Sequence, residues 1–122
     1  MTGTGAKIFR AADRNLKPAV TETGTTRIAR EIDATVSRQM GAGIEVLENV
    51  TIDWTVTYDE VLFIHSGRLT LEFGGERHEC VPGDIVWLPE GTHLRYIAQD
   101  RAEYFYALHP VDWAARQGTR EP

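Results

Sequence analysis

Hydrophobic and polar residues alternate along the middle of the chain, between residues 58 and 96, in a way that predicts consecutive β-strands. In the segment RLTLEF at residues 68–73, every second residue is apolar, which is typical of a strand that buries one face. The pair Gly74-Gly75 follows directly and favours a tight hairpin turn. Three more turn signals stand in this segment: Ser66-Gly67, Pro82-Gly83-Asp84 and Pro89-Glu90-Gly91. Turns about every eight to twelve residues leave no room for crossover helices, so we expect an antiparallel β-barrel or sandwich.

The flanking segments extend this all-β pattern in both directions. Strands are expected at residues 26–33, 40–52, 53–57 and 102–109, and a short helical turn at 112–117. The first 24 residues have no sustained period and are expected to be ordered only by docking. We therefore expect one domain with three parts: an N-terminal arm (1–24), a β-barrel (25–116) and a C-terminal tail (117–122).

Composition narrows the class of protein. The 122 residues carry a net charge of -5 with both signs interspersed, so no basic stripe points to a nucleic acid partner. Cys80 is the single cysteine, which excludes a disulfide framework and a Cys/His zinc motif. No signal-like segment or membrane-length apolar run is present. We expect a cytoplasmic protein that binds neither nucleic acid nor membranes.

Two blocks of the sequence carry a family resemblance. They are Glu60-x6-Gly67 and the segment GDIVWLPEG at residues 83–91. Together they resemble the two motifs of the cupin superfamily, over about residues 40–110. The resemblance implies a single-domain jelly-roll barrel (double-stranded β-helix) with a ligand site in its lumen. It does not fix the function, because this barrel hosts isomerases, dioxygenases, decarboxylases and pure binding proteins.

The resemblance also bears on metal binding. In metal-binding cupins an HxH pair precedes the glutamate, and a third histidine follows the PxG element. Those positions here hold Asp53 or Trp54, Thr55 or Val56, and Leu94. Only Glu60 matches, and one carboxylate does not make a transition-metal site, so we expect no metal and no cofactor. His93 lies one residue early and would face outward, unless a bulge at residues 90–92 turns it inward.

At closer range the chain resembles the cupin domain of the ethanolamine-utilisation protein Q (EutQ-like) family. The matching residues are Met40-Gly41-Ala42-Gly43, Glu48-Asn49, Trp54, Tyr58-Asp59-Glu60, Gly67, Gly83-Asp84, Pro89-x-Gly91 and Tyr106-x3-Pro110-x2-Trp113. That family resembles this chain in lacking the histidine set. Its longer members carry an N-terminal region associated with bacterial microcompartments. Nothing of that length precedes residue 40 here, so the resemblance implies only the cupin module.

Glu60 and Tyr58 are the candidate catalytic residues. Alternation predicts that both face the lumen, together with Leu62 and Ile64. A carboxyl group in an apolar lumen has a raised pKa, which suits proton transfer, and a nearby phenol can donate to a carbonyl or enolate oxygen. The candidate substrate-binding residues are Trp54, Tyr96, Tyr104, Tyr106 and His93. This set suits a small polar carbonyl, carboxylate or amine compound.

Three functions remain open at this point. The first is a metal-independent isomerase, lyase or cyclase that uses Glu60 as its acid or base. The second is a module that binds a metabolite without converting it, in which Glu60 is a hydrogen-bonded core carboxylate. The third is a metalloenzyme with the unusual ligand set Glu60, His93 and His78. The pattern also leaves open whether Glu45 or Glu48 faces the lumen.

We expect a homodimer. Small barrels of this kind expose a broad sheet face, and the arm carries apolar anchors that could exchange across a two-fold axis. These anchors are Ile8, Phe9 and Leu16. The expected partners are therefore a small-molecule ligand and a second copy of the chain.

Overall fold

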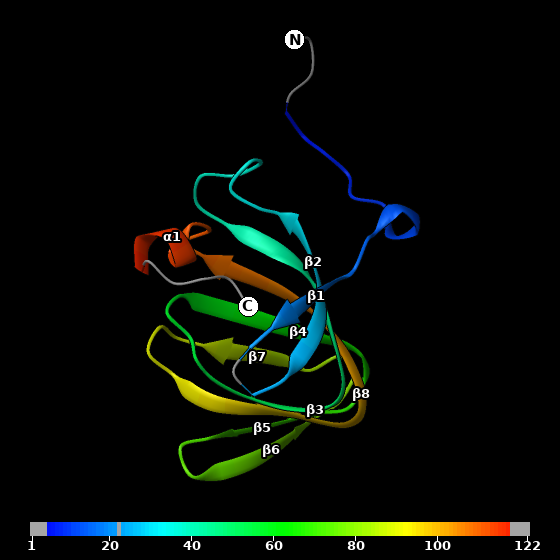
Figure 1. The fold of residues 1–122 in the computed structure, drawn as a ribbon, viewed down its shortest axis with the longest axis vertical. Helices are drawn as coiled ribbons and strands as arrows, with labels where there is room; N and C mark the ends of the chain where they lie inside the picture. Colours follow the sequence, from blue (N-terminus) through cyan, green and yellow to red (C-terminus); the bar gives the residue numbers. More distant parts are fainter. Residues whose placement is uncertain (1–4, 22, 118–122) are drawn as a thin grey trace.

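The computed structural model describes residues 5–21 and 23–117 and has the all-β barrel architecture that the sequence predicts (Figure 1). The elements are a 3-10 turn η1 (Ala11–Asp13), β1 (Lys17–Val20), β2 (Thr25–Ile32), β3 (Gly41–Thr55), β4 (Asp59–Gly67), β5 (Leu69–Phe73), β6 (Glu76–Cys80), β7 (Ile85–Leu88), β8 (His93–His109) and α1 (Trp113–Gln117). The strands form one curled antiparallel sheet in the order β1-β2-β3-β8-β4-β7, and the β5–β6 hairpin joins it through β8. The three-part division into arm, barrel and tail stays a prediction.

The two longest strands, β3 and β8, form the frame of the barrel. They pair along their whole lengths except at a register shift between Glu48 and Val50. Asn49 lies in this shift with a φ of 48°. It faces two residues of β8, Gln99 and Asp100, so the extra residue of the bulge is on β8. The second half of β8 pairs with β4 and its first half pairs with β5. The bulge thus lets both long strands pass from one side of the barrel to the other.

The pleat decides which side chains enter the barrel. On β4, Glu60, Leu62 and Ile64 are buried while the residues between them are partly or fully exposed. The same alternation runs along β8, where the even-numbered residues from Leu94 to Leu108 are buried, apart from Asp100. Period-two side-chain placement therefore fills the lumen from opposite walls.

Three of the four predicted turns lie between strands, and Ser66-Gly67 forms the end of β4. Both residues of the Gly74-Gly75 turn have positive φ, at 61° and 78°. Two predicted boundaries were wrong. Residues 40–52 and 53–57 were expected as separate strands, but β3 continues to Thr55 because β8 stays paired with it beyond the bulge. Likewise, the predicted strand at 102–109 is the second half of a strand that begins at His93.

The predicted arm contributes a strand of its own. Residues 17–20 form β1, which pairs with β2 in antiparallel register, while Ile8 and Phe9 are exposed. At the other end of the chain, α1 lies beside the barrel end, where the Val111 N–H donates to the Gln39 carbonyl at 2.8 Å. Residues 1–4 and 118–122 of the predicted arm and tail lie outside the described residues.

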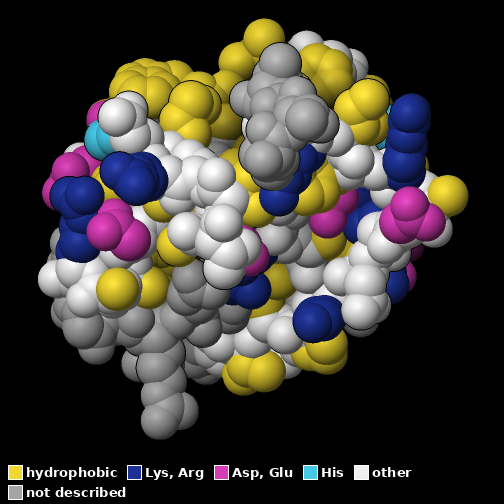
Figure 2. Space-filling model, turned by 90° about the horizontal axis from the view of Figure 1, so that it is seen from above, with side chains coloured by type: hydrophobic (Ala, Val, Ile, Leu, Met, Phe, Trp, Pro, Cys, Tyr) yellow, Lys and Arg dark blue, Asp and Glu magenta, His cyan; other side chains and the backbone are white. Residues whose placement is uncertain are grey.

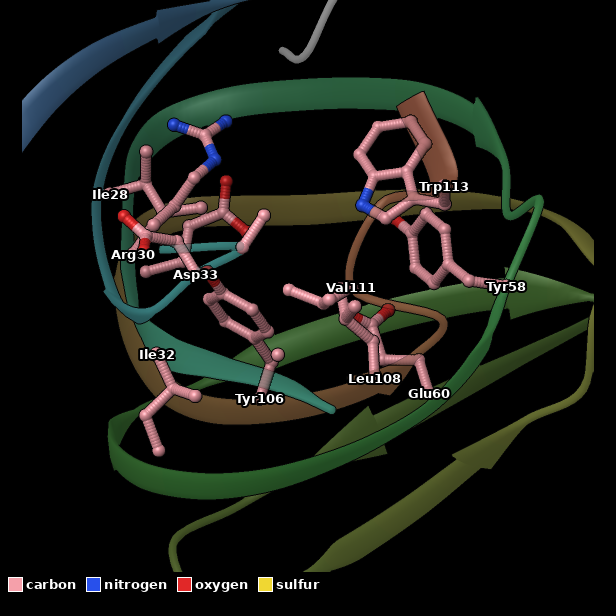
Figure 3. A pocket seen from close by; sticks show the side chains of 13 residues that line it. Ile28, Arg30, Ile32, Asp33, Tyr58, Glu60, Tyr106, Leu108, Val111 and Trp113 are labelled. Carbon is pink, nitrogen blue, oxygen red and sulfur yellow. The ribbon is translucent and has the colours of Figure 1, made fainter. Parts of the chain in front are cut away.

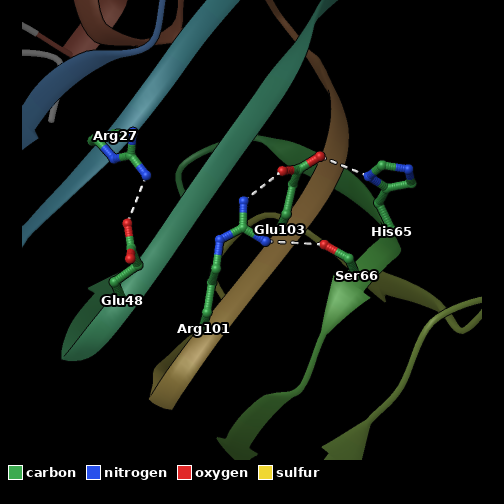
Figure 4. A network of polar contacts seen from close by, with 6 residues as sticks. All are labelled: Arg27, Glu48, His65, Ser66, Arg101 and Glu103. Atoms are coloured by element: carbon green, nitrogen blue, oxygen red, sulfur yellow. Dashed lines mark hydrogen bonds and ion pairs between the residues drawn. The ribbon is translucent and has the colours of Figure 1, made fainter.

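A polar network lies on part of the outer side of β2, β3, β4 and β8 (Figure 4). Glu103 is the centre of this network: it accepts from Arg101 at 2.9 Å and contacts His65 at 2.6 Å. Arg101 also donates to Ser66 at 3.1 Å, and Arg27 pairs with Glu48 nearby. His65 therefore faces outward.

The molecular surface mixes charges of both signs. Where its atoms are described, the face in Figure 2 shows acidic and basic side chains interspersed, with hydrophobic side chains gathered along the upper margin of the view. Within the described residues, no helix has the length and apolar character needed to cross a membrane.

Candidate functional site

Two cavities lie among the inward-facing side chains, and each takes its name from a tryptophan in its wall. The Trp113 cavity has a volume of about 70 Å³. Its wall includes Ile28, Arg30, Ile32, Asp33, Tyr106, Leu108, Val111 and Trp113 (Figure 3). The Trp54 cavity has a volume of about 40 Å³ and is lined by Thr21, Thr26, Leu47, Ile52, Trp54, Tyr96 and Tyr104. Glu45, Tyr58 and Glu60 line both cavities, so they form the boundary between them.

Glu60 is a buried acid of the lumen with a strongly raised pKa. It is 6% exposed, and its only hydrogen bond among the described residues comes from the Tyr96 hydroxyl to Oε1, at 3.5 Å. Burial raises its pKa to about 8, the negative charge of Glu45 adds to the rise, and the Tyr96 hydrogen bond opposes it. Glu60 therefore carries a proton at neutral pH, and its Oε2 atom has no described hydrogen-bond partner.

Glu45 is the lumen carboxyl that the sequence left undecided. It accepts hydrogen bonds from the Thr26 hydroxyl, at 2.7 Å, and from the Tyr104 hydroxyl. Burial raises its pKa, while the two hydroxyls and the nearby positive charge of Arg30 oppose the rise. Glu48, by contrast, is exposed and pairs with Arg27. The environment of the two lumen acids therefore favours the negative charge on Glu45 and the proton on Glu60.

Tyr58 lines both cavities. Its hydroxyl accepts a hydrogen bond from the Trp54 indole N–H at 3.0 Å. Its ring packs against Trp113, with centroids 4.7 Å apart, and Trp113 meets Trp54 edge to face at 6.0 Å. Burial raises the Tyr58 pKa well above its ordinary value. The phenol therefore stays protonated, and its own O–H can donate to a ligand.

The three tyrosines predicted on β8 all face the lumen. Tyr96 and Tyr104 stack with ring centroids 6.5 Å apart and line the Trp54 cavity. Tyr106 lines the Trp113 cavity. Burial raises the pKa of Tyr96 and of Tyr104 well above their ordinary values. Both phenols are thus neutral hydrogen-bonding groups at physiological pH.

His93 is the one predicted binding residue that the structure keeps out of both cavities. Its side chain is 65% exposed, with Nε2 3.0 Å from Asp53 and Nδ1 2.8 Å from the Thr55 hydroxyl. The reason is register: β8 pairs with β3 without a shift from Val50 to Thr55, so no bulge turns His93 inward. Its predicted contact with a lumen ligand is therefore corrected.

The lumen does not fit the metal site of metal-binding cupins. The position that corresponds to their third histidine holds Leu94, a buried apolar side chain. His78 stacks on Phe73 in the β5–β6 hairpin, with centroids 4.5 Å apart. The ligand set Glu60, His93 and His78 is therefore not assembled. Among residues 5–21 and 23–117, no group of three or more His, Cys, Asp or Glu side chains could hold a metal ion.

Sequence reasoning missed two groups of the site. Arg30 and Asp33 lie in the wall of the Trp113 cavity, opposite Trp113 and Tyr58 in the view of Figure 3. They sit at the end of β2 and in the loop that follows it, and no motif marks them. Charged residues alternate with Ile28 and Ile32 throughout this segment, so the pattern does not single out these two.

Comparison with known proteins identifies the family. The family described as "Ethanolamine utilisation protein EutQ" matches residues 20–115. The chain belongs to the EutQ family. A relative described as "Acetate kinase EutQ" from Clostridioides difficile is 29% identical over 80 residues, which are 66% of this chain and 51% of that protein. This EutQ-family chain thus spans about half the length of that relative.

Solved structures show the same cupin fold. A putative ethanolamine utilization protein Q from Salmonella typhimurium matches with a TM-score of 0.81 and 21% identity, over 91% of this chain and 92% of that one. The polyketide cyclase RemF from Streptomyces resistomycificus matches with a TM-score of 0.72 and 12% identity, over 92% and 93% of the two chains. At such identities the likeness establishes the fold alone.

Proposed function

We propose that this EutQ-family chain binds a small polar metabolite in the lumen and acts on it by metal-independent acid–base chemistry. The reaction class is an isomerisation, elimination or cyclisation, in which one proton moves on or off the substrate. The observation that carries the proposal is Glu60, a buried carboxyl that keeps its proton at neutral pH and whose Oε2 atom has no partner among the described residues. Such a group suits proton transfer near neutral pH.

The residues around Glu60 supply the other parts of such a site. Tyr58 receives the Trp54 N–H on its oxygen, so its proton remains available for a carbonyl or enolate oxygen of the substrate. Glu45, held by Thr26 and Tyr104, is the negative counterpart of the protonated Glu60. Two acids with such different surroundings can divide the roles of acid and base. General-acid action by Glu60 would weaken above about pH 8.

We do not extend the acetate kinase activity of the curated relatives to this chain. It spans about half the length of one of them and 38% and 32% of two others. Cavities of about 70 and 40 Å³ have room for only a few atoms. The negative charge of Glu45 at their boundary would also repel a polyphosphate.

Solvent-proton exchange tests the proposal even while the product is unidentified. Chelator-treated protein in D2O is incubated with panels of small carbonyl, hydroxy-acid and amine compounds, and loss of carbon-bound proton signals is followed by NMR. We expect exchange for at least one compound class, and a fall of at least about a hundred-fold in Glu60→Gln. Glu48→Gln, an exposed glutamate with its own ion pair, is the matched control and should exchange normally.

Two results would contradict catalysis. Exchange that survives in Glu60→Gln would remove this residue from the chemistry. Saturable binding to the lumen without exchange in any compound class would leave the chain as a metabolite-binding module.

We also propose that the chain forms a homodimer through an apolar face on the outside of β4, β7 and β8. This face consists of Phe63, Ile85, Trp87 and Phe105, which are 41%, 72%, 57% and 40% exposed. Phe63 pairs with Ile85 and with Phe105 across neighbouring strands, so the side chains are contiguous. An exposed apolar patch of roughly a few hundred Å² or more marks an interaction site.

A second copy is the partner that this face fits best. Strand β7, with the sequence IVWL, is at the end of the described strand order and carries no charge. Uncharged apolar edge strands invite pairing. A two-fold axis can place the β7 edge strands of two copies side by side in antiparallel orientation. The same face then serves as the interface on both copies, so no other complementary surface is needed.

Light scattering at micromolar concentration should give twice the 13.7 kDa mass of the chain. A charge in the face, as in Trp87→Asp, should produce monomers, because an unpaired carboxylate would be buried at the interface. Ile8→Asp changes the exposed arm instead and should remain dimeric. Monomeric wild-type protein would refute the dimer. If Trp87→Asp stays dimeric while Ile8→Asp becomes monomeric, the contact lies on the arm instead.

A further inference from the structure

The wall of the Trp54 cavity contains acidic, aromatic and hydroxyl groups but no Lys, Arg or His among its described residues. Its two acidic residues are Glu45 and Glu60. Its rings come from Trp54, Tyr58, Tyr96 and Tyr104. Carboxylates repel anions, and the faces of aromatic rings attract cations. This combination selects for positive charge.

Glu60 gives the cavity a specific point of attachment. More than nine-tenths of its surface is buried, and Oε2 has no hydrogen-bond partner in the described part of the chain. Glu60 lines the cavity, so a ligand there that donates a hydrogen bond can reach this oxygen. Glu45 already accepts from Thr26 and Tyr104, so Glu60 is the free acceptor.

The size of the cavity limits what can enter. About 40 Å³ accommodates a head group but not a ring or a long chain. The remainder of a ligand can extend past the Glu45, Tyr58 and Glu60 boundary into the Trp113 cavity, where Arg30 and Asp33 contribute charges of both signs. The cavity pair thus fits a short molecule with a cationic head and a polar tail.

We propose that the Trp54 cavity binds the ammonium group of a small primary amine, with Glu60 and Glu45 as its counter-charges and the Trp54 and Tyr58 rings at its sides. This inference rests on the proposed function, since it names the ligand class of the same site. Three ammonium donors match the acceptors at hand: Glu60 Oε2, the Glu45 carboxylate and the Thr26 hydroxyl oxygen.

Binding of a cation should be coupled to release of a proton. At neutral pH Glu60 holds a proton, and an ammonium ion at its oxygen favours the charged form. The charged and titratable groups around it are Glu45 from β3, Tyr58 before β4, Tyr96, Tyr104 and Tyr106 from β8, and Arg30 and Asp33 beyond the boundary. Tyr58, Tyr96 and Tyr104 stay neutral in this range because burial raises each pKa. Glu60 therefore dominates the pH response.

Three two-carbon probes test the charge preference: ethylamine, ethanol and acetate, which are cationic, neutral and anionic near neutral pH. Dissociation constants come from NMR shifts of the Trp54 indole N–H and neighbouring lumen amides. We expect ethylamine to bind in roughly the millimolar range, the scale for so few atoms, and at least about ten-fold tighter than the other two. Its dissociation constant should fall by up to about fifty-fold from pH 6 to pH 8.

Two variants separate the carboxylate from general effects. Glu60→Gln should weaken ethylamine binding at pH 8 at least about ten-fold. It should also remove the pH dependence of binding, because the amide side chain does not ionise. Glu48→Gln, on the outside of β3, should bind like wild type.

The outcomes also distinguish this inference from the function on which it rests. Tighter binding of acetate or ethanol than of ethylamine, or ethylamine binding that does not change with pH, would overturn the amine assignment and leave acid–base chemistry on another compound class intact. Absence of lumen shifts with all three probes would overturn the amine assignment as well. Exchange lost in Glu60→Gln for a carbonyl compound, with no amine binding, would show that only the ligand class was wrong.

Discussion

Replacing Glu60 by Gln is expected to make the protein more resistant to unfolding than wild type at pH 8. At pH 5 the difference in unfolding free energy between the two proteins should be much smaller than at pH 8. The wild-type carboxyl has a pKa of about 8 in the folded protein and an ordinary value of 4.5. Between these values the folded state holds a proton that the unfolded state has released. The stabilising contribution of Glu60 is therefore fully present below about pH 4.5 and is lost as pH rises through 8.

The expected size of the effect is large for a single side chain. Each pH unit in this window removes about 1.4 kcal/mol of unfolding free energy, so the total loss is on the order of 4 kcal/mol. Urea unfolding of both proteins at pH 5, 6, 7 and 8 would measure it. The Gln side chain is nearly isosteric and neutral throughout, so the variant lacks this loss.

Subtraction of the two curves isolates Glu60 from other titrating groups. Glu72, Glu103 and Asp33 have lowered pKa values, so they stabilise the fold above their unfolded pKa and lose that effect as pH falls. They are present in both proteins and cancel in the difference. Glu48→Gln should follow the wild-type curve. If the difference between wild type and Glu60→Gln stays constant with pH, Glu60 is charged in the folded protein and the proposed proton transfer loses its basis.

The placement of Glu60 could be predicted because β4 is regular and one of its faces is buried. Counting by twos from Glu60 places Leu62 and Ile64 inside, and the same count along β8 places Tyr96 and Tyr104 in the lumen. Such counting depends only on the pleat and not on distant contacts. It also placed His93 outside, and the bulge that would have reversed this is absent from its pairing with β3.

Glu45 could not be assigned by the same rule. The segment GAGIEVLENV has apolar residues at both odd and even positions, and residues on both sides of β3 are buried there, including Val46 and Leu47. A strand covered on both faces has no polar face from which to count. The contribution of Trp113 to the wall could not be foreseen either, because it depends on how the segment after β8 returns over Tyr58.

The Gly67→Ala substitution should destabilise the fold by about 3 kcal/mol or more. Gly67 has a φ of 78°, a conformation that alanine adopts only with strain. In addition, a Cβ atom at this position would lie 2.0 Å from the backbone oxygen of Arg101. That oxygen accepts the Arg68 N–H at 3.0 Å, so it cannot retreat without breaking the contact between the end of β4 and β8.

Gly74→Ala provides the matched control. Gly74 also has a positive φ, of 61°, but a Cβ atom there would have no neighbour within 4 Å. Its cost should be only the backbone strain, about 1 kcal/mol. Urea unfolding at a pH where Glu60 does not titrate, near pH 4.5 or below, would compare the two. Equal losses in both variants would mean that the β4–β8 junction yields to the extra methyl group. A much larger loss at Gly67 would explain the glycine of the Glu60-x6-Gly67 motif by close backbone approach, independently of any ligand in the lumen.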